Sequence, residues 1–263
     1  MKENQKLLLQ GTGIFILFIA LSLLTSQILR MITSSELVQS IVAFATSMLL
    51  VFICRHLIQT DKVLSSPINF TKSSYLLLVS LLAVFVIYSL LVFSVPTNVI
   101  KVFKTGLTGI ISSLLAAMTA GFFEEWLVRG IFFKGLMETY KNHKFHYIYA
   151  AVFSSLLFGF LHIINLSNSS WLAVSQQIFY AIVFGLVFSA IRIAMNGLWL
   201  PILLHSIIDF QPQLLTSSVN SAAWGPLLIL FTPLCILSLV TILALQKKKK
   251  KKKGKTTLVD EIN

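Results

Sequence analysis

Long apolar stretches separated by short polar segments make up nearly the whole chain. A helix that crosses the hydrocarbon core of a bilayer needs ~20 predominantly apolar residues. Apolar windows of at least roughly that length occupy residues 7–29, 37–58, 75–95, 105–138, 147–166, 173–194, 197–215 and 224–245. The pattern predicts an all-α, polytopic membrane helix bundle with about eight transmembrane helices.

Two of these windows are atypical. Residues 105–138 are longer than one crossing needs, which predicts a tilted or interfacial end. Residues 197–215 are interrupted by polar residues and by Pro201, which removes an amide donor and frees a carbonyl one turn earlier. Together with Asn196 and Gly197, this proline predicts a locally opened helix that could line a wet cavity.

The spans fall into four parts of the chain. Residues 1–104 hold about three spans, residues 105–215 a core of about four, residues 216–246 the last span, and residues 247–263 a polylysine tail. Small residues recur where helices would touch, because they let backbones approach closely in lipid. These positions are Gly121, Gly130, Gly159, Gly185 and Ser189.

Composition excludes a soluble globular domain. Hydrophobic residues make up 56% of the chain and charged residues 11%, with a mean hydropathy of +0.87. A soluble domain carries roughly 25% charged residues. Half of the formal net charge of +12 lies in the tail, where Lys247 to Lys253 and Lys255 contribute eight positive charges and Asp260 and Glu261 remove two. A basic run beside a membrane favours anionic lipids by about 1 kcal/mol per charge, whereas the features of a nucleic-acid reader are missing from the sequence.

The distribution of Lys and Arg predicts the orientation, since cytoplasmic loops carry the excess of positive charge. Eight spans would put both termini on one side of the membrane. Without the tail, that side holds nine basic residues, namely Lys2, Lys6, Arg55, Lys62, Lys72, Lys134, Lys141, Lys144 and Arg192. The opposite side holds three, namely Arg30, Lys101 and Lys104. We therefore expect a multi-pass protein of the cell membrane with both termini in the cytoplasm.

Nearly all ionisable side chains deep inside the apolar windows belong to three short segments. These are Glu124-Glu125-Trp126-Leu127-Val128-Arg129, Phe158-Gly159-Phe160-Leu161-His162 and His205-Ser206-Ile207-Ile208-Asp209. Ionisable groups at membrane depth are costly and mark functional sites by default. The sequence thus predicts acid–base or metal chemistry inside the bilayer.

Helical spacing assigns different tasks to the two adjacent glutamates. Residues four apart lie on one face, so Glu125 and Arg129 can pair, whereas Glu124 points about 100° away. A carboxylate without a cationic partner in an apolar setting suits a general base. The same spacing pairs His205 with Asp209, which could fix the histidine tautomer.

Three segments in this order resemble the CPBP family of intramembrane proteases. They correspond to its Glu-Glu-x-x-x-Arg, Phe-x-x-x-His and His-x-x-x-Asn/Asp motifs, within a core from about 105 to 215. That family groups the type II CAAX prenyl endopeptidases with bacterial Abi proteins, which include bacteriocin-immunity proteins. The resemblance implies an eight-helix bundle with a cavity open toward the cytoplasm. Asp209 stands where the prenyl endopeptidases have asparagine, which argues against a prenyl-CAAX substrate, and the chain looks bacterial.

The resemblance implies an intramembrane endopeptidase acting on a membrane-associated protein or peptide. Glu124 and His162 would activate water, while His205 and Asp209 would stabilise the oxyanion; Glu125, Arg129 and Phe158 would support them. The preferred mechanism requires no cofactor. The alternative is a metalloprotease in which His162, His205 and Glu124 hold zinc with one open position.

Two alternative functions without catalysis remain consistent with the sequence. One is a bacteriocin-immunity protein that shields the cell by binding a toxin or its receptor, with or without proteolysis. The other is a transporter with a proton relay, which is disfavoured because the charges converge on one site instead of crossing the membrane. The sequence determines neither the substrate nor the oligomeric state.

Overall fold

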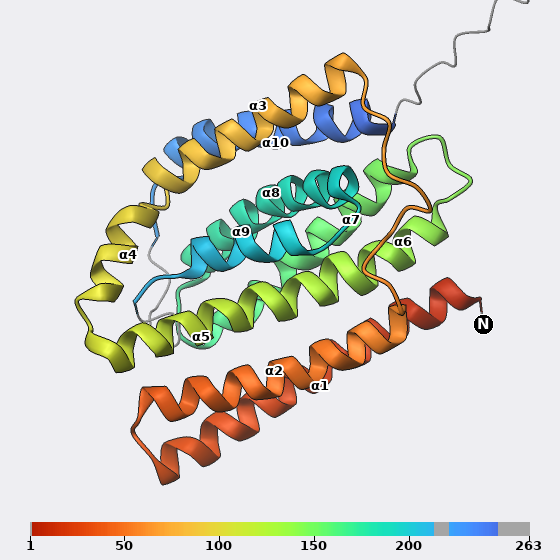
Figure 1. The fold of residues 1–263 in the computed structure, drawn as a ribbon. Coiled ribbons are helices and arrows are strands. Elements are labelled where there is room, and N and C mark those ends of the chain that lie inside the picture. The colour runs from red at the N-terminus through yellow and green to blue at the C-terminus, as the bar shows by residue number, and fades with distance from the viewer. Residues whose placement is uncertain (1, 213–220, 247–263) are drawn as a thin grey trace, which may run out of the picture.

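A computed structural model describes residues 2–212 and 221–246, and within those ranges every regular element is a helix (Figure 1). The predicted all-α membrane bundle is confirmed, because seven helical stretches are long and apolar enough to cross a membrane. The elements are α1 (Glu3–Ile32), α2 (Glu36–Ile58), α3 (Lys72–Leu91), α4 (Val95–Phe103), α5 (Gly106–Glu125), η1 (Trp126–Phe132), α6 (Phe133–Thr139), α7 (His146–Leu161), η2 (His162–Ser167), α8 (Trp171–Met195), α9 (Trp199–Asp209) and α10 (Trp224–Gln246).

The helix α8 forms the centre of the bundle. Over an apolar stretch of 18 residues in α8, 72% are buried, against 33% or less over the same length in each of the other six spans. It packs against α7 and α10, while α5 packs against α2 and α9. Figure 1 shows α1 and α2 paired along one side of the molecule and α3 with α10 along the other, so the core helices lie between two pairs.

The eighth predicted span, residues 197–215, is much shorter than expected. Helix α9 has 11 residues, or about 16 Å of helix, roughly half the thickness of the hydrocarbon core. The expectation that Pro201 opens this helix is wrong, because the proline lies in its first turn, where amides have no intrahelical acceptor. The break lies earlier, where Asn196 takes a left-handed conformation with φ 49° and ends α8.

Small residues lie where helices touch, as the sequence predicted. A Cβ added to Gly121 would lie 2.1 Å from Ser206 Oγ and 3.0 Å from the Ile202 carbonyl oxygen. At Gly185 the added atom would lie 2.9 Å from the Cα of Ser155. The close contacts of α5 with α9 and of α7 with α8 therefore depend on glycine, which has no side chain, at these two positions.

Both described ends of the chain meet the α6–α7 turn. Asn4 Nδ2 donates to Thr139 Oγ1 at 2.9 Å, and Gln246 bonds Lys144 and the amide of Tyr147. These bonds place both ends at one end of the bundle, while the tail 247–263 lies outside the described residues. One assignment was wrong: Arg192 was counted as a loop residue but is fully buried within α8. The count without it is eight against three.

Candidate functional site

A π-helix follows the two adjacent glutamates. Glu124 and Glu125 are the last residues of α5, and η1 continues the chain as a π-helical segment in which every residue is buried. The sequence predicted one continuous helix here and gave no sign of the wider turn. π-Helical segments are rare and occur frequently at functional sites.

The predicted pairing of Glu125 with Arg129 is confirmed. Arg129 Nη1 donates to Glu125 Oε1 at 2.8 Å, and both side chains are completely buried. The guanidinium carbon also lies 4.1 Å from the ring centroid of Phe158 and 5.4 Å from that of Phe188. Aromatic faces attract a cation at these distances, so the arginine is held by one carboxylate and two rings.

His205 contacts the same carboxylate, which the sequence did not predict. Its Nδ1 lies 3.0 Å from Glu125 Oε1. An ionised carboxylate only accepts hydrogen bonds, so in this contact Nδ1 carries the hydrogen and donates it. Glu125 therefore joins Arg129 on η1 to His205 on α9, and the ring stacks on Phe188 with centroids 5.5 Å apart.

The other nitrogen of His205 faces two further carboxyl groups. Its Nε2 lies 3.3 Å from Asp209 Oδ2, as the spacing predicted, and 3.9 Å from Glu124 Oε2. The side chains of Glu124 and Asp209 are 25% and 22% exposed, whereas Glu125 is sealed at 0%. The accessible face of the site thus consists of Glu124 and Asp209, whereas the His205 side chain is only 8% exposed and Glu124 Oε2, which faces it, is buried.

His162 lies at the margin of this site. It begins η2, and its Nδ1 is 3.0 Å from the carbonyl oxygen of Phe158. The Phe158 ring meets the rings of His162 and His205 edge-on, at 5.3 and 5.7 Å between centroids. His162 also interacts electrostatically with Glu124. Phe158 is thus a shared wall between the two histidines.

The geometry does not assemble the zinc ligands considered from the sequence. Within residues 2–212 and 221–246, no group of three or more His, Cys, Asp or Glu side chains is arranged to hold a metal ion. His162, His205 and Glu124 therefore do not fit a zinc centre in this arrangement. That the reaction needs no cofactor stays a prediction.

Two residues of the site were missed in the sequence. Phe188 lies one turn before Arg192 on α8, and Arg192 is fully buried with its Nε donating to the carbonyl oxygen of Arg129 at 3.2 Å. An ionisable residue inside an apolar window was the signal used for the other segments. The same signal applies to Arg192, which lies inside the window 173–194 but was counted with the basic residues that set the orientation. One phenylalanine among 21 gives no such signal.

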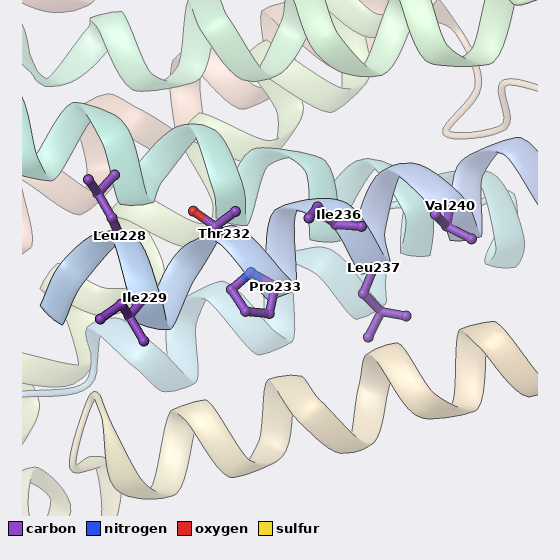
Figure 2. Close-up of a pocket in the computed structure, with 7 residues that line it drawn as sticks. All are labelled: Leu228, Ile229, Thr232, Pro233, Ile236, Leu237 and Val240. Carbon is purple, nitrogen blue, oxygen red and sulfur yellow. The ribbon is translucent and has the colours of Figure 1, made fainter. Parts of the chain in front are cut away.

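A surface groove lies apart from these residues, along α10 (Figure 2). It has a volume of about 730 Å³ and is lined by Leu228, Ile229, Thr232, Pro233, Ile236, Leu237 and Val240. Its walls carry one hydroxyl group and no ionisable side chain, so it offers nothing for acid–base chemistry.

The part of the chain that carries this site also matches a known protein family. Residues 105–211 match the family model described as type II CAAX prenyl endopeptidase, Rce1-like. The chain carries an Rce1-like domain. The CPBP resemblance is thereby confirmed, and the match coincides with the predicted core to within a few residues of its end. No curated protein and no solved structure gives a significant match to the chain. A domain of this protease family implies an intramembrane protease.

Proposed function

We propose that this protein is an intramembrane endopeptidase that hydrolyses a peptide bond in a membrane-associated protein or peptide. One observation carries the proposal: Glu124 has no arginine partner and lies beside His205 and Asp209 on the accessible face of an Rce1-like domain. Its side chain is 25% exposed and its contact with His205 Nε2 is long, at 3.9 Å. A carboxylate that is not held by a close ion pair is suited to remove a proton from a water molecule.

In the proposed mechanism, Glu124 takes a proton from a water molecule while the water oxygen attacks the peptide carbonyl. His162 assists at the edge of the site through its electrostatic interaction with Glu124. The carbonyl oxygen becomes an oxyanion, to which the doubly protonated ring of His205 donates from Nε2. Removing one such donor typically costs about 100- to 1000-fold in turnover. As the oxyanion collapses, the C–N bond breaks and Glu124 returns its proton to the leaving amine.

Glu125 and Asp209 orient the His205 ring from opposite edges. Glu125 accepts from Nδ1 at 3.0 Å, and Asp209 lies 3.3 Å from Nε2. Arg129 holds Glu125 in place through the 2.8 Å bond. Because Glu125 and Asp209 orient His205, Glu124 is the carboxylate of this group that remains available to act on water.

The test is a cleavage assay on membranes containing the wild type or Glu124→Gln. We expect Glu124→Gln to abolish cleavage at near-normal expression, since the amide keeps the shape but cannot accept the proton. Glu138→Gln is the matched control: it makes the same change on α6, where Glu138 is 57% exposed and pairs with Lys141. That variant should retain wild-type cleavage.

The outcomes separate the competing functions. Full cleavage by Glu124→Gln would contradict the peptidase mechanism. Full protection against a bacteriocin by the same variant would favour a non-catalytic immunity protein instead. The same assay is repeated after treatment with the chelator 1,10-phenanthroline. Activity retained after chelation supports the glutamate mechanism. Activity that is lost and then restored by zinc would reassign both histidines as metal ligands.

A further inference from the structure

Arg192 is a buried cation that the mechanism above does not use. Its side chain is 0% exposed, and its Nη1 and Nη2 have no hydrogen-bond partner within the described part of the chain. Its Nε donates to the carbonyl oxygen of Arg129 at 3.2 Å. A buried charge with so few partners costs stability, so its one directed bond points to a role other than stability.

That bond ends on the π-helical segment. In an α-helix the amide of Phe133 would donate to the carbonyl of Arg129, four residues earlier. Here the Phe133 amide donates to the carbonyls of Val128 and Gly130 instead. Arg192 thus supplies a hydrogen to the acceptor that the wider π-helical turn leaves without its α-helical donor.

The same segment carries the support of the site. Arg129 holds Glu125 at 2.8 Å, and Glu125 in turn accepts from His205 at 3.0 Å. Arg192 interacts electrostatically with Asp61, in the segment between α2 and α3, and less strongly with Glu125. A continuous series of contacts therefore leads from α8 through η1 to the imidazole on α9.

We propose that Arg192 is a positioning residue: it fixes the π-helical turn and thereby the orientation of Glu125 and His205. It touches no substrate. This inference rests on the proposed peptidase function for its kinetic consequence, but the geometric part concerns the His205 ring and is measurable without any substrate.

A purely structural role predicts a different result from a positioning role. Replacing a buried, poorly paired charge by an apolar side chain of similar length is often neutral or stabilising. A positioning residue should therefore be removable with the fold intact, and turnover should fall because the site is misaligned. Misplacement by about 1 Å can cost about 100-fold in rate.

The experiment compares the purified full chain with Arg192→Met, Arg192→Lys and a control, Gln176→Met. Gln176 is on the same helix, is 2% exposed, and bonds the backbone of Ala222 at 2.6 and 2.9 Å, far along α8 from Arg192. Each variant is measured for kcat, KM, thermal unfolding and the ¹⁵N signals of the His205 ring. The ring signals are assigned with His205→Ala.

For Arg192→Met we expect kcat lowered about 100-fold, KM within about twofold because substrate contacts are untouched, no loss of thermal stability, and shifted His205 signals. Arg192→Lys should recover part of kcat, and Gln176→Met should leave kcat and the ring signals unchanged. Wild-type kcat and ring signals in Arg192→Met, or an activity loss that only parallels a loss of folded protein, would overturn the proposal. Should the wild type cleave nothing, the proposed function fails, while the His205 signals still decide the role of Arg192.

Discussion

At the scale of single residues, two neighbouring glutamates have opposite environments. Glu125 is sealed and its Oε1 accepts from Arg129 and His205, whereas Glu124 is 25% exposed and lies 3.9 Å from His205 Nε2. The difference follows from helical geometry, since adjacent side chains point about 100° apart. One glutamate can therefore organise the site while the next faces the substrate.

The first residue-scale prediction concerns Arg129→Ala. This change leaves Glu125 buried without its guanidinium partner, and breaking a buried pair costs about 3–5 kcal/mol. We expect a markedly lower folded yield and a lower unfolding temperature in detergent. The matched control is Lys141→Ala, because the Lys141–Glu138 pair is more than half exposed on both sides and such pairs contribute about 0–1 kcal/mol. Normal yield and activity in Arg129→Ala would show that the buried pair is dispensable.

At the scale of secondary structure, the site depends on a close crossing of α5 and α9. Gly121 is one turn before Glu125, and Ser206 follows His205 directly. The Cβ of any other residue at 121 would lie 2.1 Å from Ser206 Oγ and 3.0 Å from the Ile202 carbonyl oxygen. A side chain there would separate the two helices where Glu125 and His205 meet.

We therefore predict that Gly121→Val lowers turnover about tenfold or more. The added side chain should also overpack the helix crossing and lower the free energy of unfolding by about 1–3 kcal/mol. The control is Gly13→Val on α1, where an added Cβ would meet no atom within 4 Å. Cleavage rates and thermal unfolding of both variants check the prediction. Equal rates for the two variants would mean that the α5–α9 spacing does not govern the site.

The sequence predicted the elements that depend on period and length, and it missed those that depend on backbone detail. Apolar windows located the spans, and spacing of four paired Glu125 with Arg129 and His205 with Asp209. The hydrogen bond from His205 to Glu125 joins residues 80 apart in the sequence, and the π-helical turn changes the backbone inside a window whose period predicts one continuous helix. The short α9 was missed because window length cannot distinguish a half-crossing from a full one.

At the scale of the whole molecule, exposed tryptophans indicate the levels of the membrane surfaces, since their rings favour the interface between membrane and water. Trp199 begins α9 with 67% exposure, and Trp171 begins α8 with 68%. His205 is six residues after Trp199, or about 9 Å along the helix. On this measure the site lies nearer to the surface at which α9 begins than to the opposite surface.

The last prediction is the side of the membrane on which that end lies. The N-terminus, the α6–α7 turn and the end of α10 are joined by the bonds of Asn4 and Gln246 (Figure 1), so they share one side. Without the tail and without the buried Arg192, this side holds eight Lys and Arg residues and the opposite side three. The excess of positive charge predicts that this side faces the cytoplasm.

A reporter that is active only outside the cytoplasm should therefore give no signal when fused after Gln246 and a strong signal when fused after residue 169. A reporter that is active only in the cytoplasm should give a strong signal after Gln246 and no signal after residue 169. The signals are normalised to the amount of each fusion protein, measured by immunoblot. Because α9 begins on the side where α8 ends, this result would place the accessible face of Glu124 and Asp209 toward the cytoplasm. The reverse pattern would place water and substrate entry on the outer side and would redirect the search for substrates to exported proteins.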